Sequence, residues 1–329
     1  MRTALGIAVA IVSAVLLVGC TSTTPASDNS LQSRLVADVT GAGAFTHLKK
    51  LQRIADENGG TRVSPGPGYD ASVDYVAGIL RNAGYEVSTP TFRVDDTNVR
   101  NVIAQTRTGS PERVVMAGAH LDSVKEGPGI NDNGSGVAAL LEIAVRLGGS
   151  PAVGNAVRFA WWGSEEAGFV GSKNYVEELS EDDRDRIQLY LNLDMVASPN
   201  AGYLVQGGEG RRSRRSGPDG SAAVARVLVD QLAAAGVTAE TTEFEGGSDY
   251  VPFIEADVPS AGVLTGDSQE KTAEQAARWG GQADEVFDRC YHEACDRLEN
   301  IDSVALDRYT DAVAGTVAHF AVSTDDLAR

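Results

Sequence analysis

The sequence predicts an α/β fold, in which a mostly parallel mixed central sheet carries helices on both faces. Apolar runs rich in β-branched residues alternate with segments of helical period, which is typical of this class. Polar side chains directly follow several of these runs, as expected where strands of such a sheet end near a ligand. The chain has 329 residues, 42% of them hydrophobic. That is enough to bury a sizeable core, and we expect one domain over residues 36–325.

The beginning of the chain predicts export and a lipid anchor. A short positive start, Met1-Arg2, precedes an apolar run at 4–18 that is too short for a membrane span. The run ends in Leu17-Val18-Gly19-Cys20, which resembles a bacterial lipobox. We therefore expect a signal peptide over 1–19, a lipidated Cys20 and a flexible tether over 20–35. An ordinary signal peptide cut nearby, with Cys20 incidental, is the alternative.

The expected elements alternate along the rest of the chain. Leu48, Leu51 and Ile54 recur at helical spacing and indicate a helix over 45–57, which ends at Asn58-Gly59-Gly60. The same criteria predict helices at 71–83, 135–147, 169–179, 222–234 and 303–323, and strands at 99–106, 113–119, 157–162, 188–193, 237–244 and 260–265.

Charge and cysteine usage narrow the function. A formal net charge of -18 without a broad basic face argues against nucleic acid as a partner. Beyond Cys20 the only cysteines are Cys290 and Cys295, which could close a small disulfide loop in an oxidising compartment. A thiolate metal pair is the alternative, although two residues between the cysteines are more usual for metals than the four found here.

Acids and imidazoles gather where strands are expected to end. Each has an ordinary explanation alone, as a polar loop, a solvated turn, a helix cap or a surface histidine. Together they match what a two-metal hydrolase needs: terminal ligands, one shared carboxylate, and a free carboxylate to move protons. The candidates are His120, Asp122, Asp132, Glu165, Glu166, Asp194 and His292.

Five motifs carry a family resemblance. HLDSVKEGPGINDNGSG, FAWWGSEEAGFVGS, YLNLDM, GGSDYVPF and FDRCYHEACDRLENI, in this order, resemble the secreted bacterial di-zinc aminopeptidases of the leucine aminopeptidase type. The same family includes glutamate carboxypeptidases, a transferrin receptor and glutaminyl cyclases. The resemblance extends from about Asp38 to Ala321 and implies the zinc exopeptidase fold.

The resemblance implies a role for each candidate residue. Asp132 would bridge two zinc ions, with His120 and Asp194 completing one site and Glu166 and His292 the other. In addition, Glu165 would be the general base, Tyr291 would hydrogen-bond the developing oxyanion, and Asp122 would orient His120.

The resemblance also implies how substrate is recognised. Glu165 and Asp194 would flank the free amino terminus of a peptide, and Met195 would line a pocket for its first side chain. Large apolar residues are therefore the expected first choice. Gly247 and Tyr250 depart from the pattern, because close relatives often have an arginine and a histidine there.

A structural calcium ion is a further implication. Asp307 and Asp311, one helical turn apart, match calcium ligands of some relatives, and Asp38 and Val39 fall where the other pair would lie. An acidic helix face without any ion explains the same residues.

The sequence thus leads us to expect a monomeric zinc aminopeptidase, lipid-anchored on the outer face of the cytoplasmic membrane. A carboxypeptidase or amidohydrolase on the same scaffold, and a peptide-binding lipoprotein without catalysis, are the alternatives.

Overall fold

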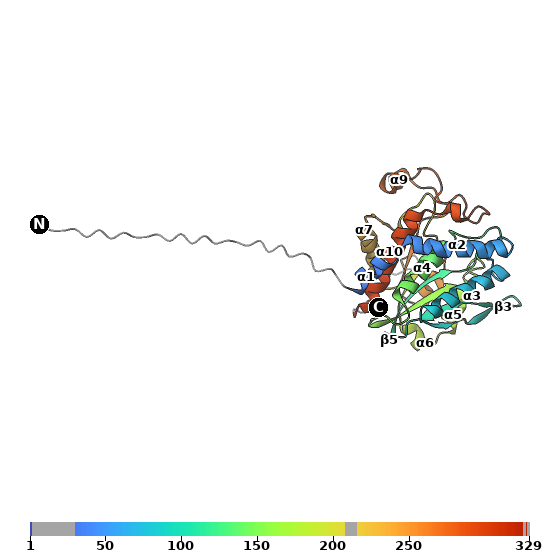
Figure 1. Ribbon diagram of the computed structural model, residues 1–329, viewed down its shortest axis with the longest axis horizontal. Helices are drawn as coiled ribbons and strands as arrows, with labels where there is room; N and C mark the ends of the chain where they lie inside the picture. Colours follow the sequence, from blue (N-terminus) through green and yellow to red (C-terminus); the bar gives the residue numbers. More distant parts are fainter. Residues whose placement is uncertain (2–29, 208–215, 325–326, 328–329) are drawn as a thin grey trace.

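A computed structural model describes residues 1, 30–207, 216–324 and 327. Its centre is an eight-stranded sheet with the order β1-β4-β6-β5-β7-β10-β8-β9 (Figure 1). The strands are β1 (Glu86–Ser88), β4 (Val102–Gln105), β5 (Ser110–His120), β6 (Asn155–Trp162), β7 (Ile187–Leu193), β8 (Leu204–Gln206), β9 (Glu240–Thr242) and β10 (Ser260–Leu264). The central strands β6, β5, β7 and β10 are parallel to one another, and β8 and β9 form a further parallel pair. The antiparallel pairs are β1 with β4, β4 with β6, and β8 with β10. The predicted mixed, mostly parallel sheet is therefore confirmed.

Helices cover both faces of this sheet, because its central strands are apolar on both sides. Val115 and Ala117 of β5 belong to one core cluster, and Val114 and Met116 to the other. The larger cluster packs α1 (Leu31–Asp38), α2 (Gly41–Glu57), α3 (Pro67–Asn82), α4 (Gly134–Leu147), α7 (Ser221–Ala234) and α10 (Ser303–Val322), and the smaller packs α5 (Val170–Glu178) and α8 (Tyr250–Glu255). Short elements complete the described chain: α6 (Glu181–Asp185), α9 (Ala273–Trp279), η1 (Leu298–Asn300), and a separate hairpin of β2 (Thr91–Val94) and β3 (Thr97–Arg100).

The predicted tether extends too far into the domain. Helix α1 begins at Leu31, where the Ser30 side chain accepts a hydrogen bond from the Ser33 backbone N–H. Leu35 of α1 is buried in the core, and α1 lies beside α10 (Figure 1). Residues 31–35 therefore belong to the folded domain. The predicted signal peptide from residue 2 onward and the predicted lipidation site Cys20 lie outside the described residues.

Two predicted strands also need correction. The expected strand 99–106 is divided at Asn101 into β3, which pairs with β2, and β4, which belongs to the central sheet. Between them, the Asn101 side chain bonds Gly163 N–H and Gly171 C=O. The expected strand 237–244 shortens to β9. None of the described helices is both long and apolar enough to cross a membrane.

Candidate metal centre

The candidate residues lie at one edge of the sheet, where the parallel strands end. His120 is the last residue of β5, Asp194 follows β7 directly, and Glu165 and Glu166 follow β6 after two residues. Since β5 is parallel to both β6 and β7, all three carboxyl ends point the same way. Strands distant in sequence therefore deliver an imidazole and three carboxylates to the same place.

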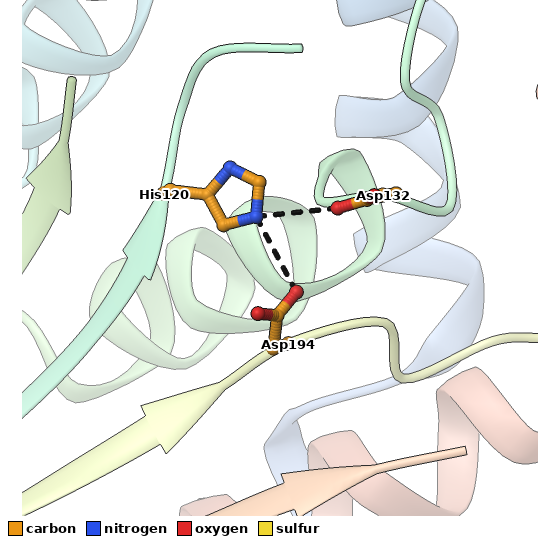
Figure 2. Close-up of side chains that lie close together, drawn as sticks. All are labelled: His120, Asp132 and Asp194. Atoms are coloured by element: carbon orange, nitrogen blue, oxygen red, sulfur yellow. Dashed lines mark ion pairs between the residues drawn. The ribbon is translucent and has the colours of Figure 1, made fainter. Parts of the chain in front are cut away.

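The first group of side chains forms around His120. Its Nε2 atom lies 3.2 Å from Asp132 Oδ1 and 3.4 Å from Asp194 Oδ1. Figure 2 shows both carboxylates pointing at this nitrogen, one from the loop after β5 and one from the end of β7. The His120 and Asp132 side chains are buried, whereas that of Asp194 is 21% exposed. We call His120, Asp132 and Asp194 the strand-end group.

The second group uses the other oxygen of Asp132. His292 Nε2 lies 3.1 Å from Asp132 Oδ2 and 3.2 Å from Glu166 Oε2. We call Asp132, Glu166 and His292 the loop group. In each group the potential ligand atoms lie within 4.8 Å of one another. Asp132 thus presents one oxygen to each group, which is the arrangement a carboxylate adopts when it bridges two metal ions.

The chemistry of these side chains fits zinc. Imidazole nitrogens and carboxylate oxygens are normal zinc ligands, and three protein ligands per ion leave a position for water or substrate. Glu166 Oε1 and Asp194 Oδ1 are buried without a hydrogen-bond partner among the described residues, as expected for atoms that await a cation. Hydrogen bonds with Asp132 and Glu166 raise the pKa of His292 to about 10. The centre therefore attracts positive charge, which two zinc ions would supply.

A clamp of hydrogen bonds fixes the loop that carries Asp132. The Asp296 side chain accepts the N–H groups of Asn131 and Asp132 at 2.7 and 2.9 Å, and its backbone C=O accepts that of Ile130. On the other side, the Asn133 side chain bonds Leu193 C=O, immediately before Asp194. The bridging candidate is consequently tied to β7 and to the segment after Cys295.

Asp122 holds the turn that presents the two glutamates. Its carboxylate accepts the backbone N–H groups of Glu165 and Glu166 at 3.1 and 3.4 Å. Its distance to His120 Nδ1 is 3.7 Å, longer than a hydrogen bond. The orienting effect on His120 therefore stays a prediction, while the contact with the glutamate turn is observed. Burial raises the pKa of Glu165, so its carboxylate binds a proton more readily, as a general base requires.

The predicted disulfide is present and carries the remaining site residues. Cys290 and Cys295 are bonded, and the loop between them includes Tyr291 and His292. The loop packs closely on the segment before Asp132, because a side chain at Gly127 would come within 2.4 Å of the Glu293 carbonyl oxygen. Tyr291 stacks on the His292 ring at a centroid distance of 3.9 Å.

A cavity opens over both groups. Besides the metal-ligand candidates and Glu165, its lining consists of Met195, Gln206, Glu245, Gly247, Ser248, Tyr250, Leu264, Asp267 and Tyr291. Ser248 Oγ donates to Asp194 Oδ2 at 2.6 Å, and Tyr250 Oη accepts the N–H groups of Gly246 and Gly247. Met195, the predicted substrate-binding residue, therefore lies beside the centre. Gly247 and Tyr250, the two positions where this chain differs from the pattern of its relatives, lie there as well.

Comparison with known proteins identifies the family. The model of peptidase family M28 matches residues 101–317. This chain belongs to peptidase family M28. It is 36% identical to a probable lipoprotein aminopeptidase, LpqL, of Mycobacterium tuberculosis, with 96% of this chain and 93% of that protein covered. It is 44% identical to leupeptin-inactivating enzyme 1 of Streptomyces exfoliatus over 84% of this chain, which spans only 61% of that protein.

A solved structure supports the assignment. The zinc aminopeptidase BSAP from Bacillus subtilis superposes on this M28 peptidase with a TM-score of 0.56 at 28% identity, covering 71% of this chain and 53% of that structure. The family, the fold class and the exopeptidase character predicted from the sequence are therefore confirmed.

The calcium prediction gains no support from the geometry. Asp307 Oδ1 accepts the Gly41 N–H at 2.6 Å, so this atom already has a partner. Burial, with Asp307 nearby, raises the pKa of Asp311 to about 6. Among the described residues, Asp38, Asp307 and Asp311 do not converge as a group of metal ligands.

Two buried charged residues near the centre were not among the candidates predicted from the sequence. Arg62 is fully buried and donates to the backbone C=O groups of Leu121, Pro128 and Gly129, in the segment between His120 and Asp132. Asp249 is fully buried with neither carboxylate oxygen hydrogen-bonded to a described residue, and burial raises its pKa to about 7. Asp249 lies within the GGSDYVPF motif, which is the one sequence signal that pointed to this region.

Proposed function

We propose that this M28 peptidase is a di-zinc aminopeptidase that removes the first residue from peptides. The observation that carries the proposal is the Asp132 carboxylate, whose oxygens face two separate histidine-carboxylate groups. The names of the relatives support the same activity, since the proteins compared above include aminopeptidases. His120, Asp132 and Asp194 would hold one ion, and Asp132, Glu166 and His292 the other.

The remaining side chains supply the proton chemistry. Zinc ions held there would polarise the scissile carbonyl and lower the pKa of a bound water towards about 7. Glu165, held by Asp122, would take a proton from the attacking water and deliver it to the departing amine. Tyr291 lines the cavity, and its hydroxyl would donate a hydrogen bond to the carbonyl oxygen as negative charge develops there.

The free amino terminus of the substrate would bind between acids. Glu165 and Asp194 both line the cavity, where they can accept hydrogen bonds from an ammonium group. Met195 and Leu264 provide apolar surface next to them, so large apolar first side chains such as leucine would be preferred.

Hydrolysis of leucyl-p-nitroanilide tests this function. The purified protein should release p-nitroaniline, lose activity with a chelator, and recover it with zinc. The Glu165→Gln variant should retain two zinc ions and lose about 10²–10⁴-fold in kcat, the usual contribution of a general base. A folded, zinc-loaded protein without metal-dependent release would refute the proposal.

Two alternatives are separated by the substrate. A carboxypeptidase or amidohydrolase with the same zinc pair should cleave amino-blocked peptides, whereas the proposed aminopeptidase should ignore them. A peptide-binding lipoprotein should bind peptides without turnover, and the Glu165→Gln change would then have no kinetic effect.

We further propose that the protein is exported, anchored through a lipid on Cys20 and active as a monomer. The support is the lipobox-like sequence together with the word lipoprotein in the name of the mycobacterial relative. Two zinc ions per chain belong to the proposal, and a calcium ion near Asp307 and Asp311 remains a prediction from the resemblance. Mass spectrometry of the mature amino terminus tests the anchor, because an unmodified residue 20 would contradict it.

A further inference from the structure

A buried hydrogen bond crosses the central strand β5 close to the strand-end group. Trp162, the last residue of β6, donates its indole N–H to the Tyr190 hydroxyl of β7 at 2.9 Å. Strand β5 lies between these two strands, and the bond passes over it at Gly118, two residues before His120. A Cβ at Gly118 would come within 2.6 Å of both bonded atoms. Glycine at this position therefore leaves room for the bond.

The Tyr190 hydroxyl continues this connection towards the metal centre. Tyr190 and Asn192 lie two residues apart on β7, which places them on the same face of the sheet, and the hydroxyl is 3.0 Å from Asn192 Oδ1. Asn192 Nδ2 lies 2.8 Å from Ser248 Oγ, and Ser248 Oγ lies 2.6 Å from Asp194 Oδ2. The four residues that lead to Asp194 are all buried. We call Trp162, Tyr190, Asn192 and Ser248 the donor chain.

The direction of every bond in the donor chain is fixed by its two ends. An indole N–H can only donate, and a carboxylate can only accept. The one hydrogen of the Ser248 hydroxyl therefore goes to Asp194, and Asn192 donates an amide N–H to Ser248. The amide oxygen of Asn192 in turn accepts the Tyr190 hydroxyl hydrogen, while that hydroxyl accepts from Trp162. All the bonds thus run in one direction and end on Asp194.

Asp194 is held by one oxygen and offers the other. Its Oδ2 atom ends the donor chain, whereas Oδ1 lies 3.4 Å from His120 Nε2 within the strand-end group (Figure 2). Residues that hydrogen-bond a metal ligand fix its orientation and tune its affinity for the metal. Aligned hydrogen bonds also polarise one another, which strengthens the last bond beyond that of an isolated serine. The donor chain therefore keeps Oδ1 turned towards the position of the metal.

We propose that the donor chain positions Asp194 for zinc, so that Trp162 and Tyr190 are positioning residues of the metal centre although they touch neither metal nor substrate. Because its bonds are aligned, a change of charge on Asp194 is transmitted to the indole N–H of Trp162. This inference rests on the proposed two-zinc function and extends the strand-end group into the core of the sheet.

The indole N–H resonances of the three tryptophans provide the test. Trp161 donates to the Val137 C=O and Trp279 to the Thr238 C=O, so neither belongs to the donor chain. Two-dimensional NMR of protein labelled at the tryptophan nitrogens should be recorded before and after zinc is added to the metal-free protein. The Trp162 resonance should shift several-fold more than those of Trp161 and Trp279, because zinc draws charge from the Asp194 carboxylate.

Ser248→Ala separates transmission along the donor chain from simple proximity to zinc. It removes the bond to Asp194 and leaves the bond between Trp162 and Tyr190 in place. In this variant, saturated with zinc, the response of Trp162 should fall to that of Trp161. An undiminished response there, or no response in the unmodified protein with zinc bound, would overturn the proposal. If metal analysis finds that the folded protein binds no zinc, the proposed function itself fails, and this inference with it.

Tyr190→Phe tests positioning through zinc affinity. It removes the hydroxyl and keeps the ring, which stacks on Phe253 at a centroid distance of 3.8 Å. Chelator competition should show a several-fold weaker affinity for one of the two zinc ions. Tyr175→Phe is the matched control, because the Tyr175 ring also contacts Trp162 but its hydroxyl bonds Arg158 outside the donor chain. Equal zinc affinities in the two folded variants would contradict the proposal.

Discussion

The two groups that share Asp132 are built very differently. The strand-end group takes His120 and Asp194 from the ends of neighbouring parallel strands, inside the core of the domain. The loop group takes Glu166 from a turn and His292 from the disulfide loop, and the His292 side chain is 41% exposed. The strand ends are fixed by the sheet itself, whereas the loop group depends on the hydrogen bonds and the disulfide that dock its loops.

This difference predicts an order in which metal is lost. The loop group should release its ion first, because local opening is easier where backbone is exposed and not part of the sheet. The strand-end group should keep its ion under milder chelation. Asp132 belongs to both groups, so replacing it should weaken metal binding at both and abolish the difference in how easily they release their ions.

The Asp132→Asn substitution should therefore have the largest effect. It removes a charged oxygen from both groups at once, so kcat/KM should fall by more than in Glu165→Gln, which removes a single acid-base group worth about 10²–10⁴-fold. Metal analysis after dialysis should show fewer than two zinc ions per chain. Full zinc content with high activity would exclude a shared bridge.

His292→Ala should separate the two groups. One zinc ion per chain should remain, because His120 and Asp194 are untouched, while activity on leucyl-p-nitroanilide is largely lost. The matched variant His120→Ala should disturb the strand-end group instead. Loss of both ions in His292→Ala would show that the groups do not bind metal independently.

Opening the disulfide should weaken the loop group more gently. The Cys290→Ser/Cys295→Ser variant frees the loop that positions His292, while Asp296 still holds the Asp132 segment. We expect a ~10–100-fold weaker affinity for one of the two zinc ions, the usual effect of altering a residue that positions a metal ligand. Competition with a chromogenic chelator measures this, and equal weakening at both sites would contradict the comparison.

Ser248→Ala should have a smaller effect on the other group. Ser248 Oγ donates to Asp194 Oδ2 and accepts from Asn192, so its loss leaves the Asp194 carboxylate less well oriented. About a tenfold loss of affinity for the more tightly held ion is expected. An effect confined to the weaker ion would contradict the assignment of Asp194 to the strand-end group.

His47 lies away from both groups, so its titration should change the stability of the fold without changing metal binding. Burial, assisted by Arg146, lowers the pKa of His47 to about 4, and His47 Nδ1 lies 2.6 Å from the Tyr75 hydroxyl. Since the unfolded chain takes up this proton near pH 6.5, folding stability should be complete above that pH and decline as pH falls towards 4. At pH 5 the loss is about 2 kcal/mol.

Urea unfolding of the chelator-treated protein at pH 7 and pH 5 measures this decline. The His47→Gln variant, which does not titrate, should show a smaller difference between the two pH values. An equal difference in both proteins would show that His47 does not contribute.

Much of the centre could be predicted because its ligands follow strands that the apolar pattern reveals. The apolar pattern of β5 and β7 was enough to predict His120 and Asp194 at their ends. The pattern of β6 did the same for Glu165 and Glu166. His292 and Tyr291 were harder to predict from the sequence, since only the motif FDRCYHEACDRLENI and the cysteine spacing marked them.

The supporting residues could not be predicted, because their partners are distant in sequence. Arg62 bonds carbonyl groups about sixty residues later, and Asp296 bonds N–H groups more than 160 residues earlier. The tether was extended too far because Leu31 and Leu35 alone show too little periodicity to predict α1.

The most direct test is a crystal structure of the zinc-loaded protein with anomalous diffraction at the zinc edge. We predict two peaks about 3.5–4 Å apart, the usual spacing of a two-metal site. Asp132 should contact both, with His120 and Asp194 on one and Glu166 and His292 on the other. A single peak, or two peaks without Asp132 between them, would contradict the account.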